Sequence, residues 1–215
     1  VAEPTGTAVI LIGEGGENMI SVIPAANGTV SPQDAERAVS EMAEGDTLML
    51  QFEIPADAIE ASLKAAKAKR VTTIINTAPL TADAARLSKL ANIVIANETE
   101  FELLIGKNGL SSSDREKELS ALHAETGQTL IVTLGADGVI AIRNGKLFKA
   151  MGLKIEPVDT VGAGDTFCGY LAASLDAGMD FEKALRRAAV AGSLACTREG
   201  AQPSIPTAAD VDAKL

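Results

Sequence analysis

Short apolar stretches alternate with longer helix-like segments along most of the chain, and this alternation limits the folds available to it. The apolar stretches cover residues 48–50, 71–75, 93–95 and 130–133, and each has the length of a buried strand. Helical patterns cover residues 32–44, 56–69 and 82–90, and a further helix, capped by Ser113, ends near Glu125. Such alternation predicts an α/β fold with a mostly parallel sheet that helices cover on both faces.

Two pairs of apolar stretches are predicted to form hairpins. Residues 139–143 and 147–150 are joined by Asn144-Gly145, which favours a tight turn. Residues 8–12 and 19–23 are joined by the glycine-rich stretch 13–18, in which glycines supply the unusual backbone angles of a turn. No linker or internal repeat divides the chain, so residues 1–215 are expected to form a single domain.

Residues 158–167 predict a strand end, a turn of small residues and the first turn of a helix whose apolar stripe recurs at 167, 171 and 175. Gly162, Ala163 and Gly164 have little or no side chain, so a ligand can approach their backbone N–H groups closely. These groups lie at the positive end of the helix dipole, where anions bind readily. The turn is therefore a candidate anion-binding site.

An acid, Asp165, lies in the middle of this candidate anion site, and two interpretations are open for it. As a helix cap, it would accept hydrogen bonds from unpaired N–H groups. As a general base, it would take a proton from an attacking hydroxyl while the turn holds the charge of a transferring phosphoryl group. Only the second interpretation accounts for the small residues before Asp165 and for a second acid, Asp159, just upstream.

Polar residues follow the predicted strands where each strand ends, at Glu53, at Asn76, at residues 97–100 and from Thr133 onward. In a parallel sheet the carboxyl ends of the strands share one edge, and ligands bind there. The separate polar segments are therefore expected to converge on one site. Taken singly, residues 97–100 are also a normal helix start, residues 133–138 an ordinary glycine-containing turn, and Glu53 an exposed acid beside a proline.

Composition and charge exclude several classes of protein. The chain is 47% hydrophobic and 22% charged, as in a folded globular protein, and its formal net charge of −10 disfavours nucleic-acid or anionic-membrane partners. Two cysteines make no disulfide framework, the beginning of the chain shows no signal-peptide pattern, and a cytoplasmic location is expected. P-loop and dinucleotide-binding glycine patterns are absent, and the single histidine, His123, has no Cys/His cluster around it in the sequence.

The segment 159–167, Asp-Thr-Val-Gly-Ala-Gly-Asp-Thr-Phe, resembles the signature near the C-terminus of the ribokinase family of sugar kinases, the PfkB-type carbohydrate kinases. The resemblance implies a three-layer α/β/α fold with a small β-lid. It also implies transfer of the γ-phosphate of MgATP to the primary hydroxyl of a pentose, most simply D-ribose, and a homodimer. Another furanose sugar or a nucleoside remains an alternative acceptor. By resemblance Asp165 is the catalytic base and also contacts the sugar, the turn 162–164 is the anion hole, and Glu53 contacts the sugar.

The same resemblance assigns nucleotide and metal ligands. Asn97 and Glu100 match the family's Asn-x-x-Glu motif, which lies near the phosphates and holds Mg²⁺ through its water shell. Further nucleotide-binding positions are implied at Thr133, Leu134, Gly135, Ala136, Asp137, Gly138, Gly164 and Ala189. The segment 198–206 resembles a loop that surrounds K⁺ in ribokinases, and the implied ligands of this activating ion are Asp159, Val161, Ala195, Arg198, Gly200 and Ser204.

The resemblance covers nearly the whole chain but only the C-terminal two-thirds or so of the family pattern. The sugar-binding Asn-x-Asp motif and the Gly-Gly pair of the family's first section are not found, and the hairpin of residues 7–23 resembles the second half of the lid. The chain is therefore expected to be a kinase without its first segment. The alternative is a nucleotide-binding fragment without catalysis.

Overall fold

The computed structural model describes residues 2–12 and 18–215 and contains two sheets. Six strands form the main sheet in the order β3-β4-β5-β6-β7-β8, which is also their order along the chain. Their bounds are Thr47–Leu50, Thr72–Asn76, Ile93–Asn97, Thr129–Thr133, Val139–Arg143 and Lys146–Ala150. Strands β3 to β6 pair in parallel, and β7 and β8 add two antiparallel pairings, so the predicted, mostly parallel sheet is confirmed.

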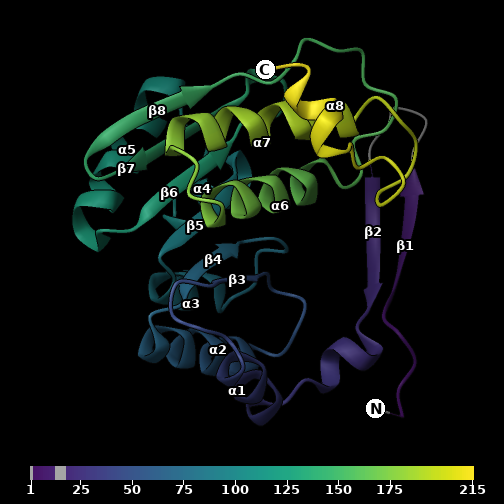
Figure 1. Cartoon of the computed structure of the whole chain (residues 1–215), viewed down its shortest axis with the longest axis vertical. Helices are drawn as coiled ribbons and strands as arrows, with labels where there is room; N and C mark the ends of the chain where they lie inside the picture. Colours follow the sequence, from purple (N-terminus) through teal and green to yellow (C-terminus); the bar gives the residue numbers. More distant parts are fainter. Residues whose placement is uncertain (1, 13–17) are drawn as a thin grey trace.

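Helices cover both faces of this sheet and form the two outer layers of a three-layer α/β fold (Figure 1). One layer contains α2, α3, α4 and α5, bounded by Ala56–Lys69, Ala84–Leu87, Glu98–Leu104 and Ser112–Thr126. The other contains α6 and α7, bounded by Ala163–Asp176 and Phe181–Ala195. Helix α1, Pro32–Ser40, packs on α2, and α8, Ala208–Asp212, packs on α7. In the described part of the chain, no helix combines the length and hydropathy that crossing a bilayer would require.

Alternation along the strands divides the apolar core between the two layers. On β5, Ile93 and Ile95 contact α6 and α7, whereas Val94 faces the layer of α2 to α5. On β6, Ile131 faces the layer of α6 and α7, and Leu130 faces the layer of α2 to α5. Each fully buried aliphatic side chain of this kind stabilises the fold by roughly 1.5–3 kcal/mol. The sheet is therefore fixed from both sides, and its edges hold the loops in defined places.

Several predicted helix boundaries were wrong for local reasons. The helix predicted over residues 32–44 ends at Ser40, and the one predicted over 82–90 divides into α3 and a 3-10 turn, Ser88–Leu90. Ser111, not Ser113, caps α5, because its hydroxyl is three residues before Asp114 and accepts the Asp114 N–H at 3.2 Å. A 3-10 turn at Ala25–Thr29 was not predicted.

Strands β1, Thr7–Ile12, and β2, Asn18–Ile23, form a separate antiparallel ribbon beside the main body (Figure 1). The two strands match the predicted hairpin, and residues 13–17 of its connection lie outside the described residues. Val9, Val22 and Ile23 on this ribbon are exposed. The ribbon thus presents apolar side chains away from the core.

Candidate active site

The turn before α6 is held in a conformation that suits glycine. Gly162 has a φ of +76°, and a Cβ there would lie 3.2 Å from the Cα of Ala201. Within the described residues, the backbone N–H groups of Gly164 and Asp165 have no acceptor, since the first hydrogen bond into the helix runs from Thr166 to Gly162. Unpaired N–H groups at the positive end of a 14-residue helix form a binding position for an anion.

Asp165 is exposed beside these N–H groups and does not cap the helix. Gly162 occupies the N-cap position, where no side chain makes a capping hydrogen bond. The Asp165 carboxylate makes no capping hydrogen bond at the start of α6, in the part of the chain that the structure describes. Of the two interpretations of Asp165, the structure therefore disfavours the cap and leaves the carboxylate available to a ligand.

The buried Cys168 thiol connects α6 to the end of β4. Burial raises the pKa of Cys168, one turn after Asp165, to about 12, and the negative charges of Asp165 and Glu100 add to the increase. The side-chain amide of Asn76, at the end of β4, donates to the Cys168 sulfur at 3.6 Å. Asn76 had only its strand-end position as a signal in the sequence, and the structure places its side chain against Cys168, one turn after Asp165 in α6.

Asn97 and Glu100 form a reciprocal cap at the start of α4. The Asn97 Oδ1 accepts the Glu100 N–H at 2.8 Å, and the Glu100 Oε2 accepts the Asn97 N–H at 3.0 Å and the Thr77 hydroxyl at 2.9 Å. The capping interpretation is therefore confirmed. It leaves the other oxygen of Glu100 without a partner among the described residues, so this oxygen can still accept a hydrogen bond from metal-bound water.

A cavity of about 730 Å³ is lined by residues from three of the segments in which the sequence predicted nucleotide-binding positions. Thr133, Gly135, Ala136 and Gly138 line it from the loop after β6, Gly164 from the first turn of α6, and Ala189 from α7. Leu134, Asp137, Asn97, Glu100 and Glu53 do not line it. Two parts of the wall were missed by sequence reasoning. One is the irregular segment 151–155, which has no periodicity to mark it; the other is formed by Gly192, Ser193 and Cys196, which continue the face of α7 that carries Ala189.

Small residues keep this cavity open. A Cβ on Gly138 would overlap the carbonyl oxygen of Ala150, and one on Gly152 would overlap the Ser193 hydroxyl. Ser193 donates to the Ala189 carbonyl at 3.0 Å and accepts the Leu153 N–H at 3.0 Å. The cavity wall is therefore fixed by its own hydrogen bonds before any ligand binds.

Asp159 connects the turn before α6 to the C-terminal loop. Its Oδ1 accepts the Val161 N–H and its Oδ2 accepts the Gly200 N–H, both at 2.9 Å. These two hydrogen bonds lower the pKa of the Asp159 carboxyl. Among the other predicted potassium ligands, Ser204 is buried with its hydroxyl donating to Ala201, and the Ala195 carbonyl accepts the Arg198 N–H.

The two segments predicted to bind K⁺ therefore lie together, joined by hydrogen bonds from the Gly200 N–H to Asp159 and from the Val158 N–H to the Cys196 carbonyl. In the described part of the chain, no three His, Cys, Asp or Glu side chains cluster as a metal site. Oxygen ligands supplied mostly by the backbone suit a large monovalent cation. A divalent ion at Glu100 would be held largely by waters and by its nucleotide.

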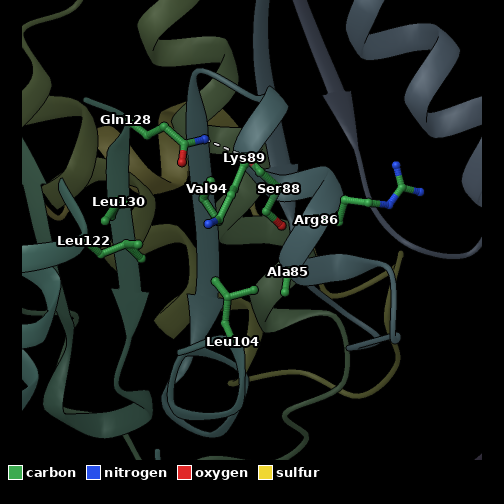
Figure 2. A pocket seen from close by; sticks show the side chains of 9 residues that line it. All are labelled: Ala85, Arg86, Ser88, Lys89, Val94, Leu104, Leu122, Gln128 and Leu130. Carbon is green, nitrogen blue, oxygen red and sulfur yellow. Dashed lines mark hydrogen bonds between the residues drawn. The ribbon is translucent and has the colours of Figure 1, made fainter. Parts of the chain in front are cut away.

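Glu53 follows β3 at the same edge of the sheet and is half-buried, and its N–H donates to the Gln51 side chain at 2.5 Å. A second cavity, of about 430 Å³, lies at the opposite end of the strands, beside Val94 and Leu130 (Figure 2). The Gln128 amide closes one side of it by donating to the Ser88 and Ala91 carbonyls. None of the predicted site residues lines this second cavity.

A family profile, curated protein sequences and solved structures all indicate the same protein family for this chain. The pfkB family carbohydrate kinase profile matches residues 1–208. A ribokinase of Haemophilus influenzae is 34% identical over 205 residues, covering 95% of this chain and 67% of that protein. The crystal structure of Thermotoga maritima ribokinase is 32% identical with a TM-score of 0.83, covering 99% of this chain and 70% of that one. Arabidopsis thaliana ribokinase complexed with ribose and ATP is 30% identical with a TM-score of 0.85, covering 99% and 69%.

Proposed function

Because the chain belongs to the pfkB family of carbohydrate kinases and is thus a phosphotransferase, we propose that it phosphorylates D-ribose. In this proposal the γ-phosphate of MgATP is transferred to the primary hydroxyl of the sugar, giving ribose 5-phosphate. The observation that carries it is the cavity of about 730 Å³, which ends at Gly164, next to an exposed carboxylate. A nucleotide lying along that cavity would bring its phosphates to the first turn of α6.

The chemistry follows from the residues of this turn. Asp165 takes the proton of the sugar hydroxyl, and the oxygen then attacks the γ-phosphorus while the bond to ADP breaks. In this proposal the turn 162–164 is the anion hole. The N–H groups of Gly164 and Asp165, which have no acceptor among the described residues, would stabilise the negative charge that accumulates on the transferring group, whereas the Ala163 N–H donates to the Thr160 carbonyl at 3.3 Å. Glu53, at the same edge of the sheet, is proposed to bind the sugar.

Two metal ions belong to the proposal. Asn97 and Glu100 would hold Mg²⁺ through water, and the ion neutralises phosphate charge when it is bound. Residues 159–161 and 195–204 would hold K⁺ behind the turn, so that the ion stabilises the loop conformation on which α6 begins. Replacing K⁺ by choline at constant ionic strength is then expected to lower activity, and unchanged activity would exclude this role.

A homodimer in the cytoplasm is also proposed. The ribbon β1–β2 supports the dimer, because exposed apolar side chains at Val9, Val22 and Ile23 favour contact with another surface. Sedimentation of the purified chain measures the oligomeric state, and a monomer at working concentration would contradict this part of the proposal.

The decisive experiment measures ADP release from MgATP by this chain in K⁺, with and without ribose. Ribose-dependent release that Asp165→Asn abolishes, with MgATP binding retained, supports the proposal. Release that another furanose or a nucleoside stimulates more strongly would change the acceptor only.

A second candidate function is nucleotide binding without catalysis. It is favoured by the cavity of about 730 Å³, which is lined by several of the predicted nucleotide-binding residues but not by Glu53, the predicted sugar contact. Calorimetry that detects MgATP binding, in a sample without sugar-dependent ADP release, would support this candidate instead.

A further inference from the structure

Arg115 is a buried cation outside the cavity that connects two helices and a loop. It lies in the first turn of α5, and its side chain is 9% exposed. The guanidinium Nη2 is 2.8 Å from Glu98 Oε1 and 3.6 Å from Glu102 Oε1, both on α4, and it donates to the Leu110 carbonyl at 3.3 Å. One side chain thus joins α4, the loop after it and α5.

Glu102 extends this connection to the loop backbone. Its carboxylate accepts the N–H groups of Gly109 at 2.6 Å and Leu110 at 2.9 Å. The loop between α4 and α5 is therefore tied to α4 at several points, and Arg115 is where these connections meet.

Helix α4 depends on such contacts for its orientation. It has seven residues, and a helix of that length is not stable by itself. Phe101 packs into the core on one side, and the Arg115 contacts hold the side carrying Glu98 and Glu102. The first turn of the same helix contains Glu100, whose carboxylate accepts the Thr77 hydroxyl at 2.9 Å, next to Asn76, which contacts Cys168 in α6.

Charge adds to the geometric argument. Glu98, Glu100 and Glu102 place three carboxylates on two turns of α4, and the whole chain has a net charge of −10. Arg115 is the cation that the structure places against two of them. Without it, Glu98 and Glu102, which are four residues apart on α4, would repel each other and the helix would no longer be held to α5.

We propose that Arg115 is a positioning residue for the nucleotide site. It holds α4 so that Asn97 and Glu100 meet the phosphates and the divalent ion, and it does so through Glu98 and Glu102 without touching the nucleotide. This inference rests on the proposed function, because it assumes that α4 contributes to binding MgATP or MgADP.

The test compares variants of the whole chain by calorimetry with MgADP. Arg115→Met keeps the apolar stem and removes the charge, and the affinity for MgADP is expected to fall roughly 10-fold, because loss of the buried cation leaves two carboxylates on α4 without their partner. Arg115→Lys should recover part of this loss. Lys107→Met is the matched control: it removes a cation that joins the same loop to α5 at Glu118, and affinity should stay within about twofold of wild type.

Glu98→Gln separates positioning from charge, and it suits the test because this side chain is 47% exposed. Loss of the contact to Arg115 should weaken MgADP binding by about two- to fivefold, the size of a partly exposed ion pair. A mere charge effect would instead strengthen binding, because one negative charge is removed, and that result would overturn the proposal. Hydrogen exchange at residues 97–101 should be faster in Arg115→Met if α4 has lost its orientation.

Failure of the inference and failure of the proposed function give different results. If the wild type shows no ribose-dependent ADP release and no MgADP affinity, the function itself is wrong. If the wild type binds MgADP while folded Arg115→Met binds it equally well, only the positioning role is wrong. If Arg115→Met does not fold, Glu98→Gln still decides.

Discussion

Gly164→Ala should make the protein more stable and less active, and these opposite effects test the candidate site. Gly164 lies in the first turn of α6, and a Cβ there would meet no atom within 4 Å. Alanine restricts the unfolded chain more than glycine does and suits a helix, so a gain of about 0.5–1 kcal/mol is expected. For a chain of this length that gain corresponds to a rise in Tm of roughly 1–4 °C.

The same methyl group would enter the space that the nucleotide is proposed to fill. Gly164 lines the cavity of about 730 Å³, and its backbone N–H has no acceptor among the described residues. Loss of one preorganised oxyanion donor costs roughly 10²- to 10³-fold in acyl transfer, which sets the scale for this site. We therefore expect a loss of that order in kcat/KM for ADP release, or weaker MgATP binding by calorimetry.

Gly169→Ala is the matched control for this prediction. Gly169 lies in the same helix, a Cβ there also meets nothing within 4 Å, and the residue does not line the cavity. A similar gain in Tm with unchanged activity is expected. If Gly164→Ala turned over at the wild-type rate, the backbone of this turn would not bind the phosphoryl group, and the proposed site would be refuted.

Asp159→Asn should destabilise the protein at pH 7, because two backbone N–H groups favour the ionised carboxylate and lower its pKa in the folded chain. This contribution to stability is present above the ordinary aspartate pKa of about 3.9, and it is lost as the pH falls through the lower pKa of the folded chain. In urea unfolding, the difference in unfolding free energy between variant and wild type should therefore shrink in acid. A difference that stays constant with pH would contradict this. Gly138→Ala should cost at least about 2 kcal/mol, because φ is +86° and the Cβ would overlap a strand carbonyl. A wild-type Tm would show that the loop after β6 can move aside. His123→Ala removes hydrogen bonds to the Gln128 carbonyl at 2.6 Å and from the Gly145 N–H at 2.9 Å, and should cost about 1–2 kcal/mol with MgATP affinity unchanged; a loss of affinity would connect the β7–β8 hairpin to the site.

The sequence was sufficient for the fold class because its signals are local. Apolar runs of strand length and amphipathic segments of helical length must bury their apolar sides against each other, and only a helix-covered sheet satisfies both. Strand ends were predictable for the same reason, and they brought Asn76, Asn97 and Thr133 to one edge. The special backbone of Gly162 was also visible as a run of small residues before a helix.

Other features depend on contacts between segments far apart in the chain, and no local pattern encodes them. Ser193 is on α7 and Gly152 is in an irregular loop, yet their close approach forms a cavity wall. Arg115 had the sequence signal of an ordinary exposed helix residue, and only packing of α5 against α4 buried its guanidinium beside two carboxylates. Periodicity determines which side of a segment is apolar, whereas the partner that each polar group meets is decided by how the layers pack, and this packing exists only in the folded chain.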